Sequence, residues 1–161
     1  MMSKKGGEKE KTRIMVFGTF DGVHKGHLNL FKQAKNLTKN SFLIVSIARD
    51  KNVLRIKGKK PDLSEKMRMS LIKKILLVDR VVLSDIKNHL PHILKARPDI
   101  IALGYDQKEY VQNLKKDLKN KGLLVKIVRL KSYKEKIYKN HLLKNKREIY
   151  GVPYINIVRT R

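Results

Sequence analysis

The hydrophobic positions of this chain form two alternating patterns, short continuous apolar runs and longer segments with helical spacing. The runs of strand length occupy residues 13–17, 41–48, 80–83, 100–103 and 123–130. Apolar runs of this length, with several β-branched residues, are typical of strands buried on both faces of a parallel sheet. The pattern therefore predicts five parallel strands.

The segments between these runs carry apolar residues at the spacing of amphipathic helices. The predicted inner faces are Leu30, Phe31, Ala34 and Leu37 in the first helix, Met67, Leu71, Ile75 and Leu76 in the second, and Ile86, Leu90, Ile93 and Leu94 in the third. Asp62 or Ser64 is the expected cap of the second helix. Residues 49–61, just before this cap, are expected to form a basic loop.

Local signals indicate the bounds of the later helices. The third helix is expected over residues 85–96, although Pro91 disfavours its first half. The fourth is expected over residues 107–120 and ends near Gly122, because glycine is the usual residue just past a helix end. Beyond residue 131 the chain is basic, and a last helix is expected over residues 135–146.

Short apolar strands separated by helices predict an α/β fold. We expect a single Rossmann-like, doubly wound domain in which a five-stranded parallel sheet is flanked by helices joined through right-handed crossovers. The 161 residues suit one domain. It is predicted to span residues 13–130, after a flexible segment of residues 1–12, and residues 131–161 are predicted to form a basic helical extension of it.

Composition excludes several classes of protein. Apolar residues make up 41% of the chain, which argues against a disordered protein. With no cysteine, a disulfide framework, a thiolate nucleophile and a cysteine zinc site are excluded. No apolar run reaches the ~18 to 20 residues of a membrane span, and the polar N-terminus does not resemble a signal peptide. A cytoplasmic protein without a membrane span is expected.

The formal net charge of +25 predicts an anionic partner. Nucleic acid, an acidic membrane surface and nucleotide or phosphate substrates all fit this charge. Aromatic residues make up only 6% and Trp is absent, which leaves few platforms for stacking nucleic-acid bases. Nonspecific polyanion binding is therefore expected in vitro, but not as the main function.

The segment GTFDGVHKGH, residues 18–27, carries the clearest chemistry. It lies between the first strand and the first helix, where a doubly wound sheet binds phosphates. Gly18 and Gly22 permit close backbone approach, and Gly26 lets the helix start pack against a bound group. His24 and His27 are three residues apart and can face one phosphate. Surface histidines in a glycine turn, or a zinc site that still lacks ligands, are the alternatives.

GTFDGVHKGH resembles the HxGH signature of the cytidylyltransferase-like nucleotidyltransferases, which join a nucleotidyl group to a phosphorylated acceptor and release pyrophosphate. The resemblance implies that His24 and His27 are catalytic, contacting the triphosphate and stabilising the transition state. It places Gly18, Thr19, Phe20 and Gly26 at the nucleotide. Asp21 is implied at the phosphate or acceptor, ordering the loop or a metal, with a turn cap as the alternative.

The segment ARDKNVLRIKGKKP, residues 48–61, is similar to a basic loop in which the family's lysine reaches the phosphates. Lys57 is the implied catalytic lysine, and Lys59 or Lys60 could substitute for it. A solvated surface charge is the alternative for each. Arg68 matches an arginine that would contact phosphate or acceptor, although its place beside the apolar stripe also suits a structural ion pair.

The segment DIIALGYDQ resembles the family's fourth strand and the loop near the nucleotide base. Tyr105 is implied at the acceptor or phosphate. Asp106 is implied at the nucleotide or a metal, or as a helix cap. Later in the chain, the family's serine- and threonine-rich motif is replaced by a segment with Asn140 and His141, which are implied to bind the nucleotide. Asn140 could still cap a helix there and present backbone amides to an anion.

Within the family, the GVH core, ALGYDQ and the length most resemble the archaeal-type FAD synthases. This resemblance implies transfer of AMP from ATP to FMN, with Mg²⁺ or another divalent cation held mainly by the nucleotide phosphates. Homodimers are common in the superfamily. A CTP-dependent cytidylyltransferase acting on glycerol 3-phosphate or another polyol phosphate is the alternative in the same class. A catalytically reduced nucleotide- or RNA-binding protein is the alternative in another class.

Overall fold

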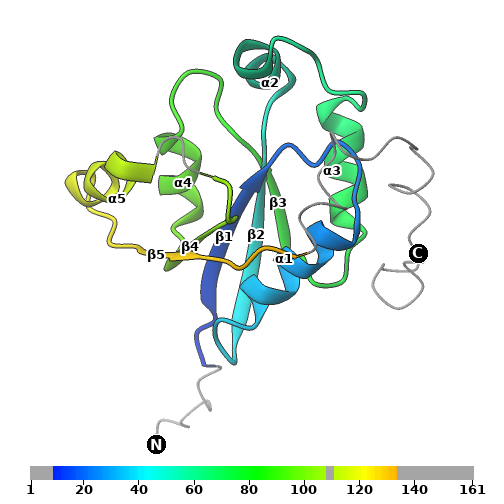
Figure 1. Ribbon diagram of the computed structural model, residues 1–161. Coiled ribbons are helices and arrows are strands. Elements are labelled where there is room, and N and C mark those ends of the chain that lie inside the picture. Colours follow the sequence, from blue (N-terminus) through cyan, green and yellow to red (C-terminus); the bar gives the residue numbers. More distant parts are fainter. Residues whose placement is uncertain (1–8, 108–110, 134–161) are drawn as a thin grey trace, which may run out of the picture.

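The computed structural model describes residues 9–107 and 111–133, which form a five-stranded parallel sheet with helices on both faces (Figure 1). The strands are β1 (Thr12–Gly18), β2 (Ser41–Ile47), β3 (Arg80–Leu83), β4 (Ile100–Leu103) and β5 (Lys126–Arg129). The helices are α1 (Lys25–Lys35), α2 (Asp50–Lys57), α3 (Glu65–Lys73), α4 (Leu90–Ala96) and α5 (Val111–Asn120). The strand order β3-β2-β1-β4-β5 confirms the predicted doubly wound α/β fold.

The sheet separates two apolar layers, because alternate side chains of a strand point to opposite faces. Ile14 and Val16 of β1 pack in the layer covered by α1 and α3. Met15 packs in the layer covered by α4 and α5. Figure 1 shows these two helix pairs on opposite sides of the sheet. Burial on both faces explains why the strands are continuous apolar runs in the sequence.

The binding edge of this fold lies where β1 and β4 diverge. β1 pairs with β2 along its whole length, but with β4 only at Ile14 and Met15. The crossover through α1 leads from β1 to β2, whereas the crossover through α4 leads back past β1 to β4. Ligands of doubly wound sheets bind at the carboxyl ends of the strands at this point of reversal.

The buried face of α1 differs from the predicted one. Leu28, Phe31 and Ala34 are buried, whereas Leu30 and Leu37 only pack at the margin of the core. The helix begins at the residue after its cap, so Leu28 belongs to its first turn and faces the sheet. The prediction was correct for Phe31 and Ala34.

Helix α3 also presents a different face to the sheet. Ser64 is its cap, since its hydroxyl accepts from the backbone N–H of Met67, and this confirms one of the two predicted caps. The buried residues of the helix are Arg68 and Ile72, while Met67 and Leu76 are exposed. A face that contains a buried arginine cannot be found from apolar spacing.

The predicted basic loop over residues 49–61 is wrong, because α2 occupies most of it. Asn52 and Val53 are its buried residues, and Gly58 ends it in the left-handed conformation, with φ of +71°. Of its three apolar residues, Val53, Leu54 and Ile56, only Val53 is buried, which is too little to reveal this helix by periodicity.

Other boundaries shift by a few residues. Residues 85–89 are not helical, because Pro91 lies in the first turn of α4, where proline is favoured. The last predicted strand shortens to β5, while Gly122, with φ of +86°, lies just beyond α5 as predicted. The helix expected over residues 135–146 lies outside the described residues. No helix of the described part has the length and apolar character that a membrane crossing requires.

Replacing Phe31 with alanine should lower the free energy of unfolding by about 3–5 kcal/mol, because the side chain is fully buried between α1 and the sheet. Urea unfolding followed by circular dichroism measures this loss. Leu124→Ala is the control, because Leu124 is 76% exposed and its truncation should change stability by less than about 0.5 kcal/mol. Equal losses in the two variants would contradict this assignment of the core.

Candidate active site

His24 and His27 stack at the N-terminus of α1, with ring centroids 3.7 Å apart and ring planes at 21°. His24 is the N-cap residue, and its Nδ1 accepts a hydrogen bond from the Gly26 N–H at 3.1 Å. His27 Nδ1 accepts from the His24 N–H at 3.4 Å. The two imidazoles thus form a reciprocal capping box, a role usually filled by a hydroxyl and a Glu or Gln side chain.

These hydrogen bonds determine which ring nitrogens can donate. A neutral imidazole whose Nδ1 accepts carries its proton on Nε2. Burial and the neighbouring His24 lower the pKa of His27 well below 6.5, although a backbone hydrogen bond with Gly22 partly raises it. His27 is therefore uncharged at neutral pH. The helix start presents imidazole N–H groups that suit the oxygens of a phosphate.

Phe20 supports this pair from the core side. Its buried ring meets His27 edge-on, with centroids 5.1 Å apart, and lies 5.3 Å from the Phe31 ring. Its φ of +52° is a left-handed conformation that is costly for a bulky residue. Such strain persists where the surroundings fix it, often at functional sites. Phe20 thus acts through its packing against His27, whereas its predicted contact with a nucleotide stays a prediction.

Two glycines shape the loop between β1 and α1 for different reasons. A Cβ on Gly18 would lie only 2.6 Å from the Phe20 ring, so the predicted close approach is to a side chain of the same loop. Gly22 has φ of +99° and donates its N–H to the Phe20 carbonyl at 2.9 Å. The loop conformation therefore requires glycine at both positions.

Arg68 fastens this loop to α2 and α3 from inside the protein. Its side chain has an exposed fraction of 0%. Its Nη1 donates to the Thr19 carbonyl at 2.7 Å and its Nε to the Leu63 carbonyl at 3.1 Å, while Nη2 pairs with Asp50 Oδ1 at 2.6 Å. These contacts match the structural ion pair considered above. A guanidinium so enclosed does not match the predicted phosphate contact.

Asp21 holds the same loop from outside. Its two carboxylate oxygens accept from the backbone N–H groups of Asp62 and Leu63, at 2.7 and 2.8 Å. Among the roles predicted for Asp21, ordering of the loop is the one that these bonds fit. The segment before α3 is thereby tied to the histidine loop.

Helices α2 and α3 cap each other with carboxylates. The Asp50 N–H donates to Glu65 Oε2 at 2.9 Å, and the Glu65 N–H donates to Asp50 Oδ2 at 3.2 Å. Glu65 Oε1 also lies 3.4 Å from Arg49 Nη1. This exchange fixes α2 beyond the carboxyl ends of the strands, at the top of Figure 1.

The predicted lysines lie on or just after α2. Lys57, its last residue, and both Lys59 and Lys60 are exposed. No described contact joins any of them to His24 or His27. The structure therefore does not bring the predicted catalytic lysine and the histidines together, and the role of Lys57 stays a prediction.

A side-chain amide bridges the carboxyl ends of β1 and β4. Gln107 Nε2 donates to the Phe17 carbonyl at 2.8 Å, and its Oε1 accepts from the Gly104 N–H at 2.9 Å. Arg129 Nη1 holds the carbonyls of Gly104 and Gln107, at 2.9 and 2.8 Å. Sequence reasoning missed Gln107 and Arg129 as site residues, and the only signal for Gln107 was its place in the loop after the fourth strand.

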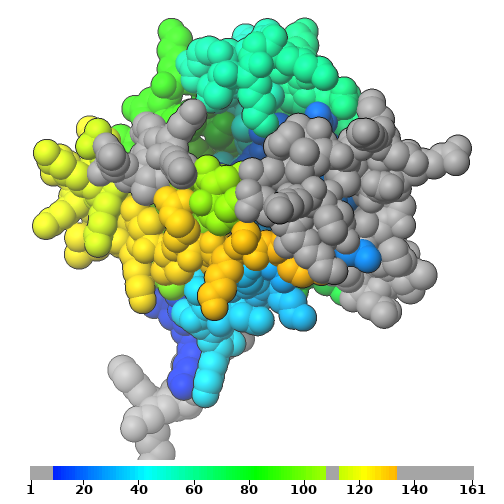
Figure 2. All heavy atoms as spheres, in the orientation of Figure 1, coloured from blue at the N-terminus to red at the C-terminus, as the bar shows by residue number. Residues whose placement is uncertain are grey.

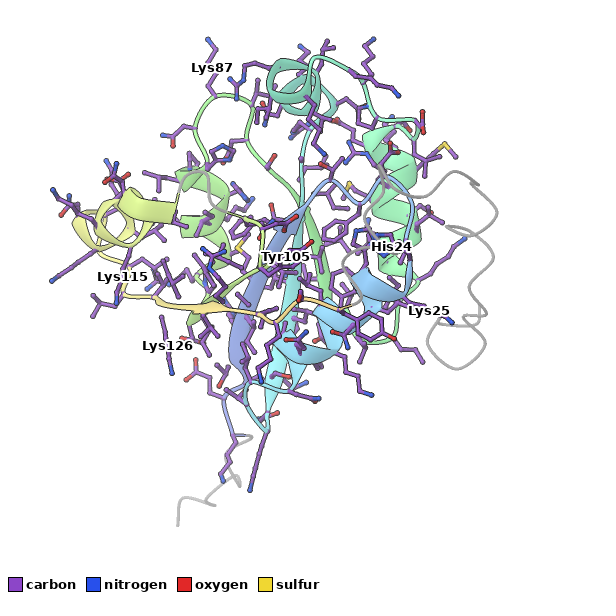
Figure 3. All side chains as sticks on the ribbon, in the orientation of Figure 1. His24, Lys25, Lys87, Tyr105, Lys115 and Lys126 are labelled. Carbon is purple, nitrogen blue, oxygen red and sulfur yellow. The ribbon has the colours of Figure 1, made fainter. Side chains whose placement is uncertain are left out.

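The remaining predicted residues are placed as follows. Figure 3 shows Tyr105 just after β4 and His24 at the start of α1, both at the carboxyl end of the sheet. Asp106 is exposed beside Tyr105. Asn140 and His141 lie outside the described residues. Figure 2 shows a hollow beneath α2, with blue atoms of the β1–α1 segment and green atoms of the β3–α4 segment at its bottom. We call this hollow the crevice.

A parallel sheet of this order, with paired histidines capping the helix after its first strand, is the arrangement expected of HxGH nucleotidyltransferases. The sequence profile of the cytidylyltransferase-like family matches residues 15–151, and the chain belongs to this family. It is 44% identical to the FAD synthase of Korarchaeum cryptofilum, over 73% of this chain and 80% of that protein. It is 35% identical to the FAD synthase of Thermoplasma volcanium, over 88% of this chain and 99% of that protein.

Solved structures agree on the fold. The crystal structure described as the lipopolysaccharide core biosynthesis protein from Thermoplasma volcanium superposes with a TM-score of 0.70 at 37% identity, covering 77% of this chain and 99% of that one. A protein of unknown function from Archaeoglobus fulgidus superposes with a TM-score of 0.58 at 18% identity, covering 74% and 90%.

Gly18→Ala should lower the free energy of unfolding by about 1–3 kcal/mol, because the new methyl group displaces the Phe20 ring. Gly104→Ala is the matched control at the end of β4, since its nearest neighbour atom would lie 3.5 Å away. That change should alter stability by no more than about 1 kcal/mol in either direction. Chemical denaturation of both variants decides the matter, and an unaffected Gly18→Ala protein would refute the close approach.

The free energy of unfolding should fall as the pH is lowered from about 7.5 to about 5.5. In this range His27 becomes protonated in the unfolded chain but stays neutral in the folded protein. The pKa of His27 is lowered in the folded state, so the loss begins near the unfolded value of 6.5 and continues toward the folded one. His27→Gln should flatten this dependence. Urea unfolding across the pH range measures it, and an unchanged slope in the variant would exclude His27 as a source.

Proposed function

We propose that the protein transfers the AMP group of ATP to the phosphate of FMN, forming FAD and releasing pyrophosphate. The observation that carries the proposal is the stacked pair of His24 and His27 at the start of α1. The names of the FAD synthase relatives support ATP and FMN as the substrates. Membership of the cytidylyltransferase-like family supports nucleotidyl transfer as the reaction.

In this reaction an oxygen of the FMN phosphate attacks the α-phosphorus of ATP. The new P–O bond forms as the bond to the bridging oxygen of pyrophosphate breaks on the opposite side. Negative charge gathers on the non-bridging oxygens, where the Nε2–H groups of His24 and His27 donate hydrogen bonds. The amino end of α1 adds its partial positive charge. A phosphate monoester is already ionised at neutral pH, so no strong general base is needed.

Charged groups complete the proposal. Lys57, with Lys59 or Lys60, would neutralise the departing pyrophosphate. Within residues 9–107 and 111–133, no group of three or more acidic or histidine side chains is arranged to hold a metal ion. We propose that Mg²⁺ is held mainly by the nucleotide phosphates, where it would neutralise negative charge. A cysteine-free chain suits the cytoplasm, where we place the reaction.

The direct test crosses ATP and CTP with FMN and glycerol 3-phosphate in the presence of Mg²⁺, and measures pyrophosphate release and FAD formation. Release that requires both ATP and FMN, with FAD as product, is the expected result. Release only with CTP and glycerol 3-phosphate would overturn the substrates and keep the reaction class. If a folded protein releases no pyrophosphate with any pair of nucleotide and acceptor, the proposal that it is a nucleotidyltransferase is overturned.

His24→Asn should lower kcat/KM at least about 100-fold, because it removes the imidazole donor. Asparagine is itself a favourable N-cap, so stability should change by less than about 1 kcal/mol. Lys32→Ala, at the exposed last turn of α1, is the control and should retain full activity. A His24→Asn enzyme with more than about a tenth of the original kcat/KM would contradict the assigned role.

A further inference from the structure

A second set of polar side chains lies at the carboxyl end of the sheet, away from the histidine loop. His92 of α4 lies between Ser46 of β2 and Asp85 of the β3–α4 segment. Its Nε2 is 2.9 Å from Ser46 Oγ, and its Nδ1 is 2.8 Å from Asp85 Oδ2. The same Asp85 oxygen accepts from the His92 backbone N–H at 2.9 Å. Three separate elements thus meet in one hydrogen-bonded chain.

The three hydrogen-bonded side chains have the order of a catalytic triad, Ser–His–Asp, but the serine is not accessible to a substrate. Ser46 is only 2% exposed and lies within β2, so its hydroxyl cannot reach a substrate. Burial lowers the pKa of His92, although Asp85 raises it. A neutral His92 donates from Nδ1 to Asp85 and accepts from the Ser46 hydroxyl at Nε2. The arrangement therefore fixes the orientation of the Asp85 carboxylate.

Asp85 keeps a binding capacity that the protein does not use. Partial burial raises the pKa of Asp85, but the hydrogen bonds from His92 lower it overall, so the carboxylate is charged. Its Oδ2 is occupied by His92, whereas Oδ1 accepts no hydrogen bond from a described residue. The side chain is 33% exposed. This charged oxygen can therefore accept hydrogen bonds from a ligand or from water.

Asn52 of α2 holds the backbone of Asp85. Its Nδ2 donates to the Asp85 carbonyl at 2.7 Å. Its side chain is 2% exposed, and its Oδ1 is buried and has no hydrogen-bond partner among the described residues. Asn52 thus helps to fix the position of Asp85 from inside the protein and is not itself accessible to a ligand.

The location of Asp85 relates it to the crevice. It belongs to the β3–α4 segment, which follows the carboxyl end of β3, and green atoms of this segment lie at the bottom of the hollow in Figure 2. Gly104 to Gln107, the loop implied near the nucleotide base, follows the carboxyl end of β4. Burial, His92 and Arg55 lower the pKa of His89, whereas Asp85 raises it, so His89 belongs to the surroundings of Asp85. The half of the crevice over β2 and β3 is thus left for the acceptor molecule.

We propose that Asp85 binds hydrogen-bond donors, hydroxyl or imide N–H groups, on the non-phosphate part of the acceptor, and that His92 is the residue that positions Asp85. This inference rests on the proposed function. A carboxylate repels a phosphate, which has only acceptor oxygens at neutral pH, and it attracts O–H and N–H groups. Asp85 would therefore orient FMN with its ribityl hydroxyls or imide at this end and its phosphate toward α1.

The test compares Asp85→Asn with Asp79→Asn. The two aspartates flank β3 at opposite ends, and Asp79 at the far edge pairs with Lys35 and accepts from the Leu43 N–H. Asp85→Asn should raise KM for FMN about tenfold or more while KM for ATP stays within about twofold. Asp79→Asn should leave both values unchanged. Riboflavin, which keeps the donors and lacks the phosphate, should compete with FMN in the original enzyme and lose this ability in Asp85→Asn.

A double variant tests the positioning role of His92. His92→Leu should raise KM for FMN as Asp85→Asn does, and the double variant should be no worse than Asp85→Asn alone. His92→Gln, which can still donate to Asp85, should restore part of the affinity. If the increases in KM for FMN of the two single variants multiply in the double variant, His92 acts on the fold and not through Asp85.

The outcomes separate this inference from the proposed function. An enzyme that forms FAD, and whose Asp85→Asn variant keeps its KM for FMN, overturns the inference alone. A chain that forms no FAD overturns the proposed function, and FMN binding, measured by quenching of flavin fluorescence, then decides the inference. Weaker quenching in Asp85→Asn but not in Asp79→Asn supports it. Equal quenching in both variants, or no binding by the original protein, overturns it.

Discussion

The buried guanidinium of Arg68 is the interaction on which the crevice depends. A cation removed from water must be paired and hydrogen-bonded, and Arg68 meets this requirement with groups from three segments, at Thr19, Leu63 and Asp50. Asp50 in turn exchanges caps with Glu65. The histidine loop and both helices of the β2–β3 crossover are therefore held in one register. An apolar side chain could fill the same space, but it could not fix the backbone carbonyl of Thr19.

Attraction and orientation of an anion are divided between different groups in this protein. The net charge of +25 draws anions toward the surface from a distance. Closer in, the pKa of His27 is lowered, first of all by burial, so this ring would bind an anion through a hydrogen bond and not through charge. Hydrogen bonds depend on direction far more than charges do. The neutral ring would therefore select a geometry from among the many anions that the lysines attract.

Local signals in the sequence were sufficient for the sheet and for the histidine loop. The apolar runs predicted β1 to β5, and GTFDGVHKGH predicted a phosphate site where α1 begins, because each depends on neighbouring residues. Helix α2 was missed because it is stabilised by Glu65, 15 positions after Asp50, and not by apolar spacing. The links from His92 to Ser46 and from Gln107 to Phe17 cross 46 and 90 positions, so only the folded chain reveals them.

The mutual capping of α2 and α3 has a consequence for where an anion can settle. Asp50 and Glu65 place carboxylates on the amino ends of these helices, so each end has its bound anion already, supplied by the protein itself. Helix α1 has no acidic residue in its first turn, and imidazoles occupy its cap. A phosphate at this edge of the sheet would thus meet carboxylates at the starts of α2 and α3, but imidazoles at the start of α1. The partial positive charge of α1 is therefore not offset by a carboxylate of its own first turn, and it lies beside the histidines.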